Sequence, residues 1–328
     1  MTPPRTYPHW VAVATIASVA ILFGGGFSAT QSALRAGFPV GAVLSLRFVL
    51  AAIGLSVLLL VRRQPLPRRA VLDGIILGLL LATLCWLLAD GLRFTTTSKS
   101  GFITSLYVPL TPLLAILLGD RVKPGHAIAA VLATLGLFLL VHLPGGPLSG
   151  WNRGDFEILL CAVLCAGHLI ATAHFSRRSS GWVLAWMQIV VTGGVSAVIT
   201  AFLPAPNGFH GVAAALNNRT GLAAIAYLVV YTMYAFWAQS TMQAFLSSTE
   251  AAVIFSLEPV TAGVVGVYLI GEKLYPLQLV GAALIIAATI SAEVLPRMIR
   301  TRAEIEPRFM KQARVAATAE KPADQIAK

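Results

Sequence analysis

The sequence predicts an all-α integral membrane protein with ten transmembrane helices, built as two inverted five-helix repeats. Its composition is 57% hydrophobic and 11% charged, whereas a soluble domain has roughly 25% charged residues. Ten apolar runs approach the roughly 20 residues that a helix needs to cross a bilayer. The stretch Ser98–Pro124 also recurs as Ser248–Pro276. Each copy would hold five helices, an odd number, so the second copy must pass through the membrane upside down.

The ten apolar runs are expected to be helices, because a backbone in lipid must satisfy its own hydrogen bonds. The first run is longer than the apolar region of a signal peptide, so we expect it to remain as a helix. The runs lie at residues 10–34, 38–61, 70–92, 101–118, 125–143, 156–176, 182–203, 220–243, 249–270 and 276–295.

The repeat also defines the domain organisation. Ser105-Leu106 matches Ser256-Leu257, and Gly119-Asp120 matches Gly271-Glu272 in residue type. A stretch rich in Gly and Pro between the two copies is typical of a linker. We therefore expect a short cytoplasmic N-terminus at 1–9, a first repeat at 10–143, a linker at 144–155, a second repeat at 156–295, and a basic, disordered cytoplasmic tail at 296–328.

The basic residues indicate an orientation rather than a nucleic-acid partner. The net charge is +11, but the Lys and Arg residues lie in short loops and in the tail, where the positive-inside rule places them. They are more numerous on the side that is cytoplasmic if the N-terminus is inside. We expect a multi-pass protein of the cell (inner) membrane with both termini in the cytoplasm, in contact with lipid but not with nucleic acid. The sequence leaves a homodimer open.

Catalytic and metal-binding patterns are not recognised. The three cysteines, Cys85, Cys161 and Cys165, lie in apolar runs without a convincing set of His and acidic ligands, so no metal site or disulfide framework is expected. The sequence has no His-Glu-x-x-His and no Gly-x-Ser-x-Gly motif. We expect no cofactor and no enzymatic activity, and a solute carrier is the favoured function. A polytopic scaffold or receptor and a lipid-modifying membrane enzyme are the alternatives.

An ordered set of short motifs resembles one known family. Arg47-Phe48 with Ala51-Ala52 is similar to its Arg-Phe-x-x-Ala-Ala motif, and Glu258-Pro259 followed by Gly271-Glu272 is the most specific match. Further matches are Phe23-Gly24-Gly25-Gly26-Phe27, which lacks the family's usual Trp and Asn, the run Thr97–Thr104, and Gly167-His168. Over residues 10–295 the chain resembles the EamA-type branch of the drug/metabolite transporter superfamily. The resemblance implies transport of a small metabolite or drug without ATP hydrolysis, with export favoured over import.

Polar and aromatic side chains within the apolar runs are the expected solute-binding residues. Arg47 lies near the middle of its run, where a charge costs about 2.5–3.5 kcal/mol. It either holds an anionic group in a cavity or forms a structural pair. Tyr227, Tyr231 and Tyr234 follow one face of the run at 220–243. The predicted binding residues are Arg47, Thr104, Tyr107, His168, Gln188, Tyr234, Trp237 and Gln239.

Two acids are predicted to couple transport to a proton or ion. Glu258 lies deep in its run next to Pro259, and its spacing from Glu250 predicts that the two acids share one helical face. It either carries a proton or accepts a fixed hydrogen bond. Asp90 is the second candidate, although Arg93 at i+3 makes it a plausible interfacial ion pair. Helix-weakening residues are the predicted hinges: Gly24, Gly25, Gly26, Pro109, Pro112 and Pro259.

Overall fold

The structure is a computed structural model that describes residues 7–94, 97–119, 122, 124–141, 152–203, 208–209, 212–265, 276–277, 279–288 and 290–291. All regular structure within these ranges is helical. The elements are α1 (His9–Arg35), α2 (Val40–Val61), α3 (Arg68–Gly91), α4 (Thr97–Ser105), α5 (Tyr107–Leu117), α6 (Pro124–Val141), α7 (Arg153–Ser176), α8 (Gly181–Phe202), α9 (Val212–Ala215), α10 (Arg219–Met242), the 3-10 turn η2 (Gln243–Phe245), α11 (Ser248–Phe255) and α12 (Leu257–Val265).

The predicted multi-pass membrane architecture is confirmed, but the count of ten spans is not. In the described ranges six helices are long and apolar enough to cross a membrane: α1, α2, α3, α7, α8 and α10, the last together with η2. The run expected at 125–143 is α6, and Leu279–Ala288 is a short apolar helix within the run expected at 276–295. The runs expected at 101–118 and 249–270 are each split into two helices.

Proline and short polar side chains set the beginnings of the long helices. Pro8, Pro39 and Pro67 immediately precede α1, α2 and α3, and proline favours a helix start because its fixed φ and missing N–H do no harm there. Asn152 begins α7 by accepting a hydrogen bond from the Asp155 N–H. The predicted tail, 296–328, and the linker residues 144–151 lie outside the described part of the chain, as do Asp120, Gly271 and Glu272.

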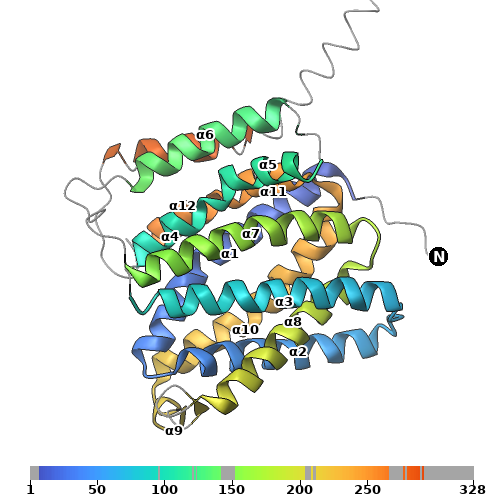
Figure 1. The fold of residues 1–328 in the computed structure, drawn as a ribbon, viewed down its shortest axis with the longest axis vertical. Coiled ribbons are helices and arrows are strands. Elements are labelled where there is room, and N and C mark those ends of the chain that lie inside the picture. Colours follow the sequence, from blue (N-terminus) through green and yellow to red (C-terminus); the bar gives the residue numbers. More distant parts are fainter. Residues whose placement is uncertain are drawn as a thin grey trace, which may run out of the picture.

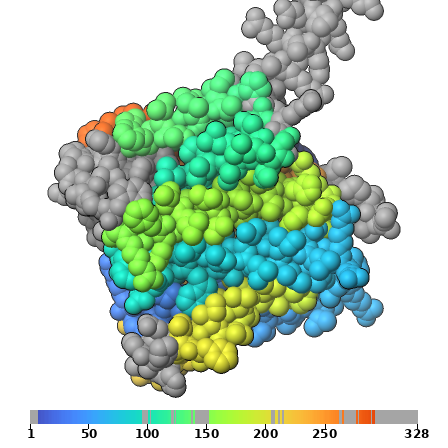
Figure 2. All heavy atoms as spheres, viewed as in Figure 1, coloured from blue at the N-terminus to red at the C-terminus, as the bar shows by residue number. Residues whose placement is uncertain are grey.

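The long helices pack in pairs that relate the two halves of the chain by an inverted repeat. The first helix of the first half, α1, packs on α10, and the first helix of the second half, α7, packs on α3 in the same way. The second helices, α2 and α8, pack on each other. Figure 1 shows the helices as a stack of roughly parallel rods, from α6 at one edge to α2 and α8 at the other. In Figure 2, α6, α5, α7, α3 and α8 follow one another across one face.

The two split helices run side by side in opposite directions. The N-terminal piece α4 contacts the C-terminal piece α12, and α5 contacts α11. The chain turns at Leu106 in one and at Ser256 in the other, 150 positions apart. Alignment of the two breaks differs by one residue from the sequence alignment that matched Ser105-Leu106 with Ser256-Leu257. In the alignment of the breaks, Pro109 of the first repeat is equivalent to Pro259 of the second. The antiparallel contact is what an inverted repeat requires.

Proline explains both breaks. Pro109 and Pro259 are the third residues of α5 and α12. Each lacks the N–H that would bond to the carbonyl four residues earlier, and its ring clashes with that carbonyl. The helix is therefore interrupted three residues before each proline. Thr111 and Thr261, two residues beyond the prolines, each donate a hydroxyl hydrogen bond to the carbonyl four residues back, a second correspondence between the copies.

We expect Gly78→Ala to destabilise the contact between α3 and α8. A methyl group on Gly78 would come within 2.6 Å of Val191 Cβ and 3.0 Å of Gln188 Cα. Overpacking of this kind costs about 1–3 kcal/mol. Thermal unfolding of the detergent-solubilised protein should show a lower midpoint. Gly194→Ala is the control, because a methyl group there meets nothing within 4 Å. An unchanged midpoint for Gly78→Ala would contradict the close packing of these helices.

Candidate functional site

A cavity of about 140 Å³ lies where the two halves of the bundle meet. It extends from the middle of the bundle toward the C-terminal ends of α1 and α3. We call this end of the bundle the Arg35 end, and the opposite end, where α1 begins, the His9 end. The lining is mostly apolar, with a few polar side chains, as is usual for small-molecule sites. The lining residues are Phe23, Gly26, Phe27, Thr30, Arg47, Leu81, Leu84, Cys85, Leu88, Leu92, Thr104, Tyr107, Cys165, His168, Leu169, Tyr231, Phe236, Gln239, Phe255 and Glu258.

Arg47 is the cation of the cavity, and residues around it fix its position. The residue is 8% exposed. Its Nε donates a hydrogen bond of 2.7 Å to Thr232 Oγ1 on α10. Its guanidinium carbon lies 4.7 Å from the ring centre of Phe48 and 4.8 Å from that of Tyr231, within cation–π range. Arg47 is thus buried, as the sequence predicts, and its neighbours orient the guanidinium group.

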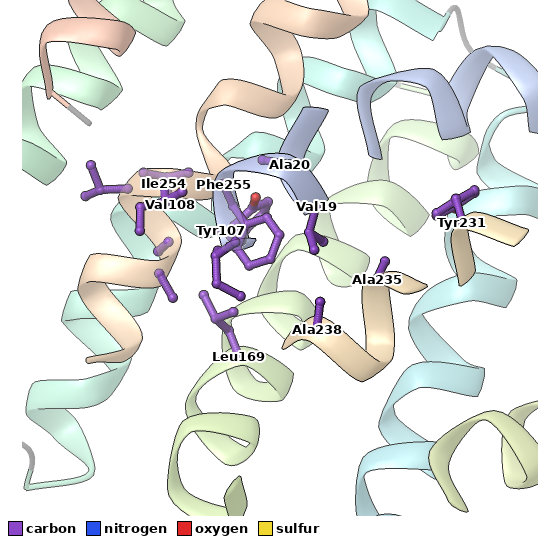
Figure 3. Packing of buried hydrophobic residues seen from close by; sticks show 14 of the residues in the cluster. Val19, Ala20, Tyr107, Val108, Leu169, Tyr231, Ala235, Ala238, Ile254 and Phe255 are labelled. Carbon is purple, nitrogen blue, oxygen red and sulfur yellow. The ribbon is translucent and has the colours of Figure 1, made fainter. Parts of the chain in front are cut away.

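Tyr107 and Glu258 meet across the boundary between the two halves. The Tyr107 hydroxyl donates to Glu258 Oε2 over 3.4 Å. Both residues lie within two positions of a helix break, Tyr107 at the start of α5 and Glu258 near the start of α12. Figure 3 shows the Tyr107 ring close to Val19 and Ala20 of α1. The two proline-linked breaks therefore bring a phenol and a carboxyl group from distant parts of the sequence into one site.

His168 and Thr104 add polar groups to the lining. His168 Nε2 lies 3.0 Å from Gln188 Oε1, and the Gln188 amide donates to Ser240 Oγ over 2.9 Å. Gln188 therefore supports His168 from behind rather than lining the cavity itself. Thr104 is 5% exposed, and its Oγ1 has no hydrogen-bond partner in the described part of the chain. Gln239 also faces the cavity.

Besides Gln188, two of the predicted binding residues lie outside the cavity lining. Tyr234 is on the exposed side of α10, where its hydroxyl is 2.7 Å from Ser18 Oγ. Trp237 packs against Trp182 and Tyr234, with ring centres 5.1 Å and 6.1 Å apart. Among the described residues, neither contributes to the cavity lining.

Asp90 belongs to an ion-pair cluster at the Arg35 end. It lies 2.9 Å from Arg93 and 3.0 Å from Arg153, and Arg153 also contacts Glu157 at 2.6 Å. The cluster joins α3 to the start of α7 and is apart from the cavity that contains Glu258. A second pair joins the other end of α3 to the loop after α7: Asp73 lies 2.6 Å from Arg178. This hydrogen-bonded pairing raises the pKa of Arg178.

Glu250 closes the His9 end of the bundle together with two histidines. Its Oε1 lies 2.8 Å from His9 Nε2 on α1, and its Oε2 lies 3.8 Å from His126 Nε2 on α6. Ser247 and Glu250 also form the capping box of α11, and Ser247 Oγ is 3.0 Å from His126 Nδ1. Because the break at Ser256 separates α11 from α12, Glu250 does not share a continuous helical face with Glu258.

The predicted hinge residues fall into two structural groups. Pro109 and Pro259 lie at the breaks, and Pro112 lies inside α5. The glycines lie within α1, which is helical throughout. A methyl group on Gly25 would come within 2.5 Å of the Tyr227 hydroxyl, and one on Gly26 within 2.9 Å of the Tyr231 hydroxyl. These two glycines therefore let α10 approach α1 closely.

Several lining residues are missing from the sequence prediction. Tyr231 was recognised on the tyrosine-bearing face but not selected, and Thr30, Cys85 and Cys165 were not proposed as binding residues. Phe23, Phe236 and Phe255 form an aromatic wall, with ring centres 6.2 Å and 5.7 Å from Phe23. A long apolar helix gives no polar stripe from which an inward face could be recognised. Within the described residues, no group of three His, Cys, Asp or Glu side chains could hold a metal ion.

The sequence model of the EamA-like transporter family matches residues 10–142 and 152–292. An uncharacterized transporter of Archaeoglobus fulgidus is 33% identical over 201 residues, 61% of either chain. Another from that organism is 25% identical over 181 residues, 55% of this chain and 60% of the relative. The chain thus spans about three fifths of these curated relatives. A crystal structure of a protein with 21% identity shares the fold, with a TM-score of 0.68 over 88% of this chain and 99% of the other.

The two acid clusters of α3 should differ in their contribution to stability. The Asp73 side chain is 5% exposed, and it accepts hydrogen bonds from Arg178 and Ser179. Asp73→Asn should therefore cost about 1–3 kcal/mol. The Asp90 side chain is 24% exposed and its partners are more so, so Asp90→Asn should cost about 0–1 kcal/mol. Denaturation in detergent measures both, and equal losses would contradict the assignment.

Proposed function

Because the chain belongs to the EamA-like transporter family, we propose that it is a secondary transporter, which exports a small organic solute by alternating access. The observation that carries this proposal is the cavity at the junction of the two halves, with polar groups supplied by both. The solute binds there, and the two ends of the bundle open in turn. Export is proposed from the family resemblance. No catalytic step and no cofactor form part of this function.

The proposed orientation follows from the basic residues. Arg62, Arg68 and Arg178 lie at the His9 end of the described bundle, together with Arg63, Arg69 and Arg177. We place this end at the cytoplasm of the inner membrane, with both termini on that side. The cavity then extends toward the outer side, and the described state is closed at the cytoplasmic side by the contacts of Glu250 with His9 and His126.

Alternating access requires the contacts of Glu250 with His9 and His126 to separate. Opening of the His9 end would part α11 from α1 and α6, while the Arg35 end closes over the cavity. The breaks at Leu106 and Ser256 lie beside the cavity, at the ends of α5 and α11 that line it, and the rest of these two pieces extends toward the His9 end. They allow α5 and α11 to tilt without bending α4 and α12. This is the role we assign to Pro109 and Pro259.

Accessibility of single cysteines on the two sides tests the transport cycle. In a background without native cysteines, Thr30→Cys reports on the cavity side and His126→Cys on the closed His9 end. Both positions are buried. We expect a solute that is transported to raise labelling at one position and to lower it at the other. Simultaneous labelling or protection at both, with no uptake of any solute from a broad panel, would reject the proposal.

We also propose that Glu258 carries a proton whose movement is coupled to transport. It lies in the cavity and contacts Tyr107 across the boundary between the halves. The other titratable or charged groups of the lining are Arg47 on α2, Cys85 on α3, Tyr107 on α5, Cys165 and His168 on α7, and Tyr231 on α10.

The rate of solute uptake into proteoliposomes should lose its dependence on an imposed pH gradient in Glu258→Gln, because an amide cannot take up or release the proton. His168→Gln is the matched control, since His168 is the lining group that ordinarily titrates nearest neutrality. We expect this variant to retain the gradient dependence. Loss of the dependence in His168→Gln but not in Glu258→Gln would transfer the coupling role to the histidine.

A further inference from the structure

Arg47 is a positive charge whose balancing partner is missing among the described residues. Its hydrogen bond goes to the neutral hydroxyl of Thr232. No carboxylate of the described residues lies within 4.0 Å of it, because each ion pair there involves other groups. A buried charge is ordinarily paired, and an Arg at this depth costs about 2.5–3.5 kcal/mol. An anionic ligand would supply the missing counter-charge.

The geometry of the guanidinium group indicates which anion fits. Thr232 occupies Nε, and the rings of Phe48 and Tyr231 lie against the group. Among the described residues no hydrogen-bond partner takes the two terminal nitrogens. They form a planar fork that matches the two oxygens of a carboxylate. Because three neighbours hold the plane of the fork, little orientation is lost when a carboxylate binds.

Thr104 is an independent observation that points to a ligand in the same cavity. The residue is 5% exposed and lines the cavity. Its hydroxyl has no partner in the described part of the chain. A buried hydroxyl without a hydrogen bond costs about 1–3 kcal/mol. A polar solute group adjacent to α4 would remove this cost.

The remaining walls define the body of the solute. Phe23, Phe236 and Phe255, with Leu81 and Leu84, give the cavity an aromatic and aliphatic surface. Its volume of about 140 Å³ resembles that of an engineered apolar cavity of about 150 Å³ that admits benzene. An apolar body of about one ring therefore fits.

We propose that the transported solute is a small monocarboxylate with an apolar body of about one ring, whose anionic group is bound by Arg47 and Thr104. This assignment rests on the proposed transport function, in which Glu258 carries the proton. When Glu258 is protonated it adds no negative charge, so one carboxylate balances Arg47. A dianion would exceed that charge, and a cation would meet Arg47 unfavourably.

Binding of matched ligands to the detergent-solubilised full chain tests the class. Phenylacetate, phenylacetamide and phenethylamine share one body and differ in charge. We expect saturable binding of phenylacetate by calorimetry, and binding at least about tenfold weaker, or about 1.4 kcal/mol, for the other two. Equal binding of the amide would overturn the proposal. So would tighter binding of L-phenylalanine, a zwitterion, or the failure of phenylacetate, benzoate and 4-methyl-2-oxopentanoate alike.

Variants test the residues. Arg47→Gln should weaken phenylacetate binding by about tenfold or more. Arg47→Lys should lie between this variant and the wild type, because it keeps the charge but not the fork. Thr104→Val should lose a few-fold in affinity. Arg62→Gln is the control, since Arg62 is exposed at the His9 end against Trp182. If Arg47→Gln does not fold, unchanged affinity in both Arg47→Lys and Thr104→Val would still overturn the proposal.

Uptake into proteoliposomes separates the failure of this proposal from the failure of the transport function. Saturable movement of neutral or cationic solutes, but of no monocarboxylate, would reject the solute class and leave the transporter intact. Movement of no solute, with no alternation of cysteine labelling, would reject the transport function as well. We expect the wild-type protein to show counterflow of the monocarboxylate that binds most tightly. The rate of this counterflow should fall by at least about tenfold in Arg47→Gln.

Discussion

The antiparallel contact between two proline-broken helices is the constraint on which the rest of the structure depends. In a membrane, irregular backbone is tolerated where it is buried in protein or lines a cavity. Pro109 and Pro259 interrupt both helices in the middle of their paths, and the inverted arrangement brings the two interruptions together. The cavity forms beside them, and Tyr107 and Glu258 are among its polar groups.

Two hydrogen bonds that hold polar groups of the cavity connect one half of the chain to the other. Arg47 of the first half is oriented by Thr232 of the second, and Tyr107 of the first contacts Glu258 of the second. A shift of one half against the other would therefore change the geometry of the binding groups directly. Binding and the closure of the bundle are linked by the same side chains, which is how a ligand can favour one conformation over another.

The sequence predicts the membrane-spanning architecture well, because long apolar runs leave few alternatives in a bilayer. Prediction from the sequence fails where a run is apolar throughout. The break at Ser256 is not visible in hydropathy, so Glu250 and Glu258 were expected on one face although they lie on different helices. Tyr231 faces the cavity and Tyr234 the exposed side of α10. Choosing between them requires the packing partners of α10, which sequence spacing does not provide.

Because of its capping box, α11 can stay helical whether or not the His9 end is closed. Ser247 and Glu250 Oε2 satisfy the first backbone donors of α11, whereas Glu250 Oε1 reaches His9 on a different helix. Water can replace the histidine at Oε1 while the capping bonds remain. The helix can thus detach from its neighbours as a preformed rod, and the separation breaks the contacts of Glu250 with His9 and His126 rather than unwinding a turn.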